Sequence, residues 1–200
     1  MKKVYKGEFG YVKYRRKAAV IRTLIMLAIA VGFFVAGLII FGSQKNVLSI
    51  IAALCCLPAG LSAVNMIMFL RAGFCKDEDH DKILKHCGDL LIHYDHVITS
   101  YDKNFNVHAS TVLDKNICLY SDDDSFDASD LEKHVKKMMA QIGYSDYSIK
   151  LFNNIDKYCE RLDQLEKLRA DRNIDPKAIE DAWVPGTLET PASVLLSISL

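Results

Sequence analysis

The chain has 200 residues, half of them apolar, and its 25 basic and 25 acidic side chains give a formal net charge of zero. Its six cysteines show no CxxC spacing and no evenly paired framework, which argues against a disulfide-stapled secreted domain and indicates free thiols in a reducing compartment. The charge is unevenly distributed, because Arg22 and Lys45 are the only ionised residues between Ala18 and Leu70. The remaining C-terminal part, about 125 residues, is long enough for one domain and too short for two.

Residues 1–17 form a basic and aromatic arm, with seven lysines and arginines against the single acid Glu8 and with four interleaved aromatic rings. Such a mixture suits the headgroup layer of a membrane, so the arm is predicted to be a cytosolic membrane-surface anchor. Nucleic-acid binding is the alternative, and we expect no nucleic-acid partner. Gly7 and Gly10 do not form a phosphate-binding loop, since no GK[ST] follows them.

Residues 18–70 are predicted to form a hairpin of two transmembrane helices. The apolar runs Ala18–Phe41 and Val47–Leu70 each extend for roughly 36 Å as helices, more than the hydrocarbon thickness of a bilayer. A cleaved signal peptide would have a shorter apolar region and an A-x-A-like site, which the first run lacks. We therefore expect two uncleaved spans and the lipid bilayer as a partner.

The basic residues predict the orientation of this hairpin. Seven precede the first span, Arg71 and Lys76 follow the second, and only Lys45 lies in the turn. The positive-inside rule then puts both termini in the cytosol, in a multi-pass protein of the bacterial plasma (inner) membrane. The five-residue turn is too short for an external domain.

Small residues recur at a spacing of four in both spans and predict a packing face. The two stripes, expected to face each other or a second copy of the chain, are Ala28, Gly32 and Ala36 in the first span and Ala52, Cys56 and Gly60 in the second. Neither span carries an acid or base at its centre, which disfavours a pump or carrier. Cys75 follows the second span directly, where a thiol is a candidate for palmitoylation.

Residues 71–184 are predicted to form a cytosolic α+β domain with the element order α-β-β-β-α-β-α. A charged helix over 76–87 precedes an antiparallel meander over 89–100, 105–113 and 117–120, in which alternate residues share a face. Ser129 and Glu132 form a capping box for the next helix, and a strand over 147–151 and a helix over 155–172 follow. A last short helix starts at Asp175-Pro176. The tail, residues 185–200, ends in an apolar stretch expected to dock on the domain or on the bilayer.

The densest acidic cluster, Asp122–Asp124, lies between a strand end and a helix start. Aspartates there commonly cap free backbone amides, and we expect this role and no cofactor. The alternative is a Mg²⁺ or Mn²⁺ site, extended by Asp95 and Asp114. His93 and His96 invite a zinc interpretation, but residues three apart on a regular strand point to opposite faces, so no metal site is predicted there; His96 is expected to be a hydrogen-bonded core histidine.

Two resemblances bear on identity. Through its arm YKGEFGYVKYRRK and the LPAGLSAVNMIMFLR of its second apolar run, the chain is similar to a group of uncharacterised two-span membrane proteins of Gram-positive anaerobes. Some of these carry an O-linked N-acetylglucosamine transferase-like label, which implies a sugar transferase with Asp122–Asp124 as the only candidate site. The element order over about Lys76 to Arg172 resembles the restriction-endonuclease-like fold, which implies an acid-x-lysine on the third strand. That strand reads Asn116-Ile-Cys-Leu-Tyr120 and departs from the pattern.

The sequence therefore favours a non-enzymatic, membrane-anchored interaction or regulatory module, whose cytosolic domain binds a protein partner or forms a homo-oligomer. The alternative is a metal-dependent phosphodiesterase, or a glycosyl or phosphoryl transferase, that uses Asp122–Asp124. A small oligomeric pore or transporter accessory is the third possibility.

Overall fold

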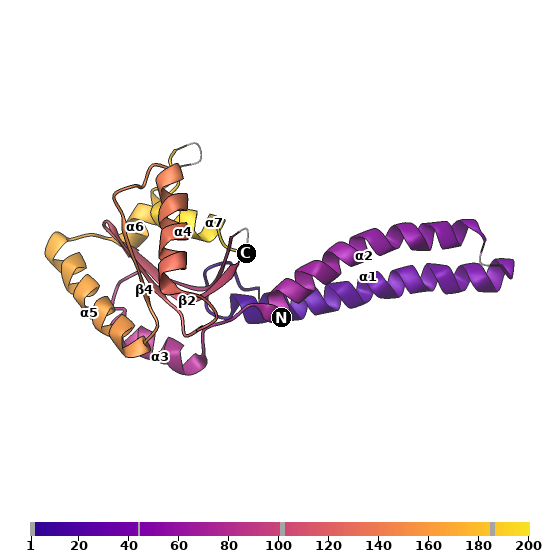
Figure 1. Cartoon of the computed structure of the whole chain (residues 1–200), viewed down its shortest axis with the longest axis horizontal. Coiled ribbons are helices and arrows are strands. Elements are labelled where there is room, and N and C mark those ends of the chain that lie inside the picture. The colour runs from indigo at the N-terminus through magenta and orange to yellow at the C-terminus, as the bar shows by residue number, and fades with distance from the viewer. Residues whose placement is uncertain (1–2, 44, 101–102, 185–186) are drawn as a thin grey trace. The chain divides into compact units, whose positions relative to one another are not determined.

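The computed structural model describes residues 3–43, 45–100, 103–184 and 187–200. The chain divides into two compact units, and each is described by itself (Figure 1). One, the helical hairpin, is Val12–Ala72; the other, the α+β unit, joins Met1–Tyr11 to Gly73–Leu200. The first eleven residues thus belong to the same unit as the C-terminal domain.

The helical hairpin consists of α1 (Tyr11–Phe41) and α2 (Val47–Arg71), so the two predicted long apolar helices are confirmed. Asn46 caps α2, because its side chain accepts a hydrogen bond from the Ser49 amide at 2.8 Å. Gly37 is needed beside this cap, since a Cβ atom at residue 37 would lie 2.7 Å from Asn46 Oδ1 and 3.0 Å from Leu48 Cβ. At the other end of the hairpin, Arg16 donates to the carbonyl oxygens of Phe69 and Ala72, the last turn of α2.

The seam between α1 and α2 follows a spacing of three, four and seven residues, as in helices that pack with a left-handed crossing. Its buried members are Ala19, Thr23, Ala30, Gly37, Ala52, Ala59, Ser62 and Phe69. The Thr23 and Ser62 hydroxyls lie 2.9 Å apart and form a hydrogen bond across the seam.

Of the two predicted small-residue stripes, only Ala52 is buried in this seam. Ala28, Gly32, Cys56 and Gly60 are exposed, and Ala36 is half-buried. The stripes therefore do not face each other in the hairpin. Their contact with a second copy of the chain stays a prediction.

A four-stranded mixed sheet forms the centre of the α+β unit. Its order is β1 (Ile92–Thr99), β2 (Asn104–Leu113), β3 (Asn116–Tyr120) and β4 (Ser148–Phe152). The first three strands are the predicted antiparallel meander, and β4 pairs parallel to β3 with Cys118 opposite Lys150. The predicted α+β class and element order are confirmed to this extent.

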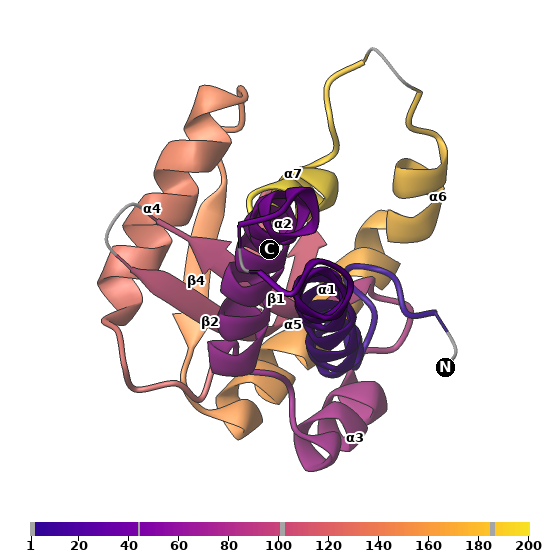
Figure 2. The same cartoon turned by 90° about the vertical axis from the view of Figure 1, so that its right-hand side faces the viewer.

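Helices cover both faces of this sheet. On one face, α3 (Asp77–His86) and α5 (Ile155–Arg172) supply Ile83, Tyr158 and Leu162 to the first core cluster. On the other, α4 (Ala128–Gln141) and α7 (Pro191–Ser197) supply buried side chains to the second cluster, among them Val135 and Leu195. The short α6 (Pro176–Asp181) follows α5 in the chain. Figure 2 shows α4 at the upper left of the strands and α3 at the lower right.

Along β1 and β2, side chains that should share one face of the sheet pack into different core clusters, so the predicted strict alternation is wrong. Tyr94 belongs to the first cluster and Ile98 to the second, although residues four apart on a regular strand share a face. On β2 the same change separates Val107 from Ala109. On β1 the switch coincides with Asp95, which has a left-handed backbone with φ of 57°. Its buried carboxylate is held by the Cys75 amide at 2.8 Å.

The outer edge of β1 is covered by both end segments of the α+β unit. Gly7 bridges to Tyr94 and Ser199 bridges to Ile98, each in antiparallel fashion. Gly7 has φ of 90°, and a Cβ atom there would lie 2.8 Å from His93 Nδ1. Phe9 stacks on His80 with the ring centroids 3.8 Å apart.

The apolar tail docks on the α+β unit. Val194 and Leu195 of α7 are buried in the second core cluster, and the Leu200 amide donates to the Val97 carbonyl at 2.9 Å. Of the two predicted docking surfaces for the tail, the domain is therefore the observed one.

The start of α4 differs from the predicted capping box. Asp127 is the N-cap, and its carboxylate accepts from the Ser129 amide at 3.0 Å. Glu132 instead reaches the outer edge of β4, where it accepts the Leu151 amide hydrogen at 2.8 Å. The carboxylate therefore satisfies a donor of an edge strand rather than of its own helix.

Candidate functional site

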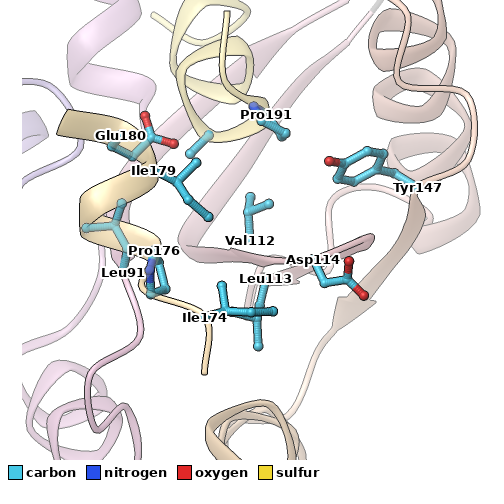
Figure 3. A pocket seen from close by; sticks show the side chains of 11 residues that line it. Leu91, Val112, Leu113, Asp114, Tyr147, Ile174, Pro176, Ile179, Glu180 and Pro191 are labelled. Atoms are coloured by element: carbon cyan, nitrogen blue, oxygen red, sulfur yellow. The ribbon is translucent and has the colours of Figure 1, made fainter. Parts of the chain in front are cut away.

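An apolar pocket of about 260 Å³ opens between the end of β2 and the two C-terminal helices (Figure 3). Its apolar lining is Leu91, Val112, Leu113, Ile174, Pro176, Ile179, Pro191 and Ala192. Asp175 positions α6 beside it, because its carboxylate accepts from the amides of Lys177 and Ala178 at 3.0 and 3.1 Å, and Pro176 starts the helix. A concave, mainly apolar site with few polar groups is the usual form of a binding pocket.

Three polar side chains lie around this pocket. Asp114 Oδ2 accepts from Arg172 Nη1 at 2.5 Å, and Glu180 Oε2 accepts from the Thr190 hydroxyl at 2.6 Å. The Tyr147 hydroxyl points across the cavity in Figure 3. Burial raises the pKa of Tyr147, with a smaller effect from Tyr144 and Asp114, so the phenol is neutral at physiological pH. Two carboxylates therefore lie at the edge of the pocket, and hydrogen bonds from Arg172 and Thr190 hold them in place.

Exposed apolar side chains continue from the pocket along the chain. We call Ile179, Trp183, Val184 and Leu188 the apolar rim; their exposed fractions are 52%, 39%, 59% and 59%. Among the described residues of the α+β unit, the only other large apolar side chains this exposed are Tyr5 and Leu84. These four side chains lie within ten residues of the chain, and exposed apolar side chains that gather on a surface mark an interaction site.

The acidic segment that the sequence singled out is held by structural contacts. Asp122 pairs with Lys76, and its Oδ1 lies 2.6 Å from His108 Nε2. Burial acts to raise the pKa of Asp122, but the Lys76 hydrogen bond and the nearby His108 and Lys76 charges outweigh it and hold that pKa below its usual range. The carboxylate is thus ionised and already paired.

The next two aspartates differ from each other. Asp123 accepts from Asn106 Nδ2 at 2.6 Å and from the Ser125 amide at 2.9 Å. Burial raises the pKa of Asp123, and the bonds from Ser125 and Asn106 lower it further than burial raises it. Asp124 is exposed. Within the segment, Asp123 therefore closes a turn.

The other two candidate carboxylates lie apart from this segment. Asp95 is buried on β1 against the Cys75 amide, as described above. Asp114 lies in the turn before β3 and Asp122 follows the end of that strand, so a five-residue strand, about 17 Å long, separates them. Among the described residues, no group of three or more histidine, cysteine, aspartate or glutamate side chains is arranged to hold a metal ion. The described geometry gives the alternative Mg²⁺ or Mn²⁺ site no support.

The two strand histidines are closer together than a regular strand allows. The left-handed Asp95 lies between them, and the rings of His93 and His96 meet edge to face with centroids 6.3 Å apart. His96 is buried, with Nε2 2.8 Å from the Ser110 hydroxyl, as expected of a core histidine. Burial, and to a smaller extent His93 and Lys6, lowers the pKa of His96 to about 3, so its ring is neutral.

The thiol proposed for lipid modification is buried. Cys75 is 1% exposed and belongs to the first core cluster. Palmitoylation of Cys75 stays a prediction, and it would require this segment to leave the core.

The pocket and the apolar rim were not among the predicted sites. The sequence signal for them was the apolar side chains in the short segments before and after Pro176. A helix as short as α6 cannot bury all of these side chains against the domain. Comparisons of the chain with models of protein families, with curated proteins and with solved structures found no match.

Proposed function

We propose that the protein is an integral membrane protein whose α+β unit, on the cytosolic side, binds a partner protein through the apolar rim and the adjoining pocket. The observation that carries this proposal is the concentration of exposed apolar side chains between Ile179 and Leu188, next to a 260 Å³ apolar pocket.

Membrane insertion of the helical hairpin is supported by what its helices expose. In the most apolar windows of α1 and α2, only 11% and 17% of the residues are buried. Large side chains such as Leu24, Ile39 and Leu61 are 60%, 78% and 71% exposed. A helix that is apolar on all sides needs an apolar solvent, and both helices are long enough to span a bilayer. The proposed cytosolic placement of the α+β unit follows from the basic residues that flank the helices.

The charge of the segment that carries the rim indicates the chemistry of the partner. Between residues 175 and 189 the chain carries four acids and one base, a net charge of −3. Complementary potentials favour association, so the fitting partner segment has an apolar anchor side chain flanked by lysine or arginine. The anchor fills the pocket, where most of the binding energy of such an interface is expected.

Binding can be followed through Trp183, the only tryptophan of the chain, which lies in the apolar rim. The full-length protein in a non-ionic detergent is titrated with two tryptophan-free peptides that share a leucine or phenylalanine anchor, one flanked by lysines and one by glutamates. We expect a saturable blue shift of the Trp183 emission, and protection from acrylamide, with the lysine-flanked peptide alone.

Two variants test the surface. Ile179→Asp should abolish the response, and Leu84→Asp should retain it, because Leu84 is equally exposed at 54% but lies on α3, outside the pocket. Equal responses to both peptides, or equal losses in both variants, would refute the proposed contact surface.

The orientation has its own test. Ser43, in the turn between α1 and α2, is exposed. Ser43→Cys should react with a membrane-impermeant maleimide in intact cells, whereas Ser125→Cys, in the α+β unit, should react only after the cells are opened. The reverse pattern would place the α+β unit outside the cytosol and contradict the topology.

A further inference from the structure

A second and larger cavity, about 430 Å³, lies between β3, β4 and α5, and it shares no lining residue with the apolar pocket. We call it the basic groove, and the side chains that define it are Asn116, Cys118, Lys150, Phe152, Lys157 and Arg161. Its volume falls in the range of small-molecule sites.

The local sequence explains why this part of the sheet is polar. β4 is an edge strand whose side chains alternate, so that Ile149 and Leu151 join the core cluster under α4 while Lys150 and Phe152 point to the other face. On α5, Lys157 and Arg161 are four residues apart and lie on the same side of the helix. The apolar packing of α5 on the sheet therefore gives way to a charged cavity at β4.

Among the described residues, the cations of this groove have no carboxylate partner. Arg161 donates to Asn116 Oδ1 at 3.2 Å and to Gln164 Oε1 at 2.9 Å, both neutral amides. Lys150 Nζ lies 5.4 Å from the centre of the Phe152 ring. Within the described part of the chain, neither these two residues nor Lys157 forms an ion pair with a carboxylate, and Glu160 is the only acid that lines the cavity.

This arrangement differs from the neighbouring surface, where cations are paired. Lys82 meets Asp156, Lys115 meets Asp146, and Arg169 meets Glu166. Like charges four residues apart on a helix destabilise it by a few tenths of a kcal/mol. Three cations around one cavity therefore keep a positive potential that an anion would neutralise.

We propose that the basic groove binds a phosphate-bearing small molecule. The planar guanidinium of Arg161 presents paired N–H donors that match phosphate oxygens, and the two lysines add point charges. Phe152 offers an apolar wall for an unsaturated or ring-shaped part of the same ligand. The site does not overlap the apolar rim, so this inference goes beyond the proposed function and does not depend on it.

Cys118 is a buried residue in the lining of the groove. Burial raises the pKa of its thiol, and the nearby Arg161 and Lys150 only partly oppose that effect. A neutral thiol that is 2% exposed is a poor nucleophile. The groove is therefore suited to reversible binding rather than to a covalent step.

Isothermal titration calorimetry on the full-length protein in a non-ionic detergent tests the proposal with pyrophosphate, ADP, adenosine and citrate. We expect saturable binding of pyrophosphate or ADP, none of adenosine, and weaker binding of citrate. Affinity should fall as salt is raised, because the contacts are electrostatic.

Arg161→Gln should weaken phosphate binding roughly tenfold or more, as expected for the loss of a charge-assisted contact. Lys157→Gln, at an exposed position where the fold is not at risk, should weaken it severalfold. Lys167→Gln is the matched control, since it removes an exposed lysine of the same helix outside the groove. The proposal is overturned if neither pyrophosphate nor ADP binds, if citrate binds more tightly than both, or if Lys157→Gln and Lys167→Gln have equal effects.

Discussion

Substitution of Glu132 tests whether its side chain satisfies the hydrogen-bond donor of Leu151 on the edge strand β4. The Glu132 carboxylate accepts the Leu151 amide hydrogen at 2.8 Å, from a helix to an edge strand 19 residues away. Leu151 is only 8% exposed, so water does not readily replace the lost acceptor when Glu132 is truncated.

The expected cost follows from the kind of bond. A hydrogen bond to a charged acceptor contributes roughly 1.5–3 kcal/mol, and Glu132 is half-buried, so Glu132→Ala should destabilise the α+β unit by about 2 kcal/mol. Glu132→Gln keeps a neutral acceptor and should cost about half as much. An effect of about 2 kcal/mol corresponds to a roughly 30-fold loss of amide protection, or to about 1 M in the midpoint of urea unfolding.

Hydrogen exchange of the peptide that covers β4, in the full-length protein, measures this directly. Lys137→Ala is the control, since it removes an exposed side chain from the same helix. If the Leu151 amide exchanges equally fast in the native chain and in Glu132→Ala, the Glu132 side chain does not satisfy the strand edge.

Three further predictions concern close approaches and a buried base. Gly7→Ala should expose the Tyr94 amide to exchange at least fivefold faster, a cost of about 1 kcal/mol or more, because its Cβ would meet His93 at a residue that also has a positive φ. Gly10→Ala shares the positive φ, 81° against 90°, but has open space, so it should accelerate exchange less; equal effects would rule out the clash. Gly37→Ala should destabilise the hairpin against unfolding in SDS by roughly 1–3 kcal/mol, measured by the loss of helical signal. Gly60→Ala lies in open space and should leave this stability unchanged; a harmless Gly37→Ala would contradict the close approach of Gly37 to Asn46. The folded state holds His96 neutral with a pKa of about 3, whereas the unfolded chain binds a proton at this histidine below about pH 6.5. The contribution of His96 to the free energy of unfolding should therefore be constant above about pH 6.5 and should fall by up to about 1.4 kcal/mol per pH unit below it. Urea midpoints of His96→Gln should show a shallower decline between pH 7.5 and 5, and parallel curves would contradict this.

The sequence carried enough information for the element order but not for the faces of the strands. Hydrophobic periodicity located the helix through Leu131 and Val135 and each of the four strands, because those signals are local. The change of face at Asp95 depends on the amide of Cys75, twenty residues earlier, and no periodicity contains that contact.

The wrong capping residue and the choice of seam within the hairpin have the same origin. Asp127 and Ser129 are both good capping residues, and the contact of Glu132 with β4 decides between them. In the hairpin, several sets of small residues satisfy the spacing rule. The observed seam is the one in which Thr23 can bond Ser62 and Gly37 can approach Asn46, and neither pair is visible from a single helix.

The candidate site was harder to predict than the fold. The acidic segment attracted attention because carboxylates cluster in the sequence, yet Lys76, His108 and Asn106 bind two of them from other elements. The basic groove had no such density, since its cations come from β4 and from two turns of α5. Because folding is what brings Lys150 close to Lys157 and Arg161, no local cluster of basic residues in the sequence marks this groove.

The α+β unit is discontinuous in the chain, because the whole hairpin Val12–Ala72 is inserted between its first segment and the rest. During synthesis the segment with Gly7 and Phe9 leaves the ribosome first, but its partners on β1 and α3 are made only after both hairpin helices. The unit therefore completes the cover of its β1 edge only after the whole hairpin has been synthesised. For the same reason, a fragment that starts after the hairpin lacks one cover of β1. A separately expressed α+β unit would keep this cover if residues 3–11 were joined to residue 73 by a flexible linker.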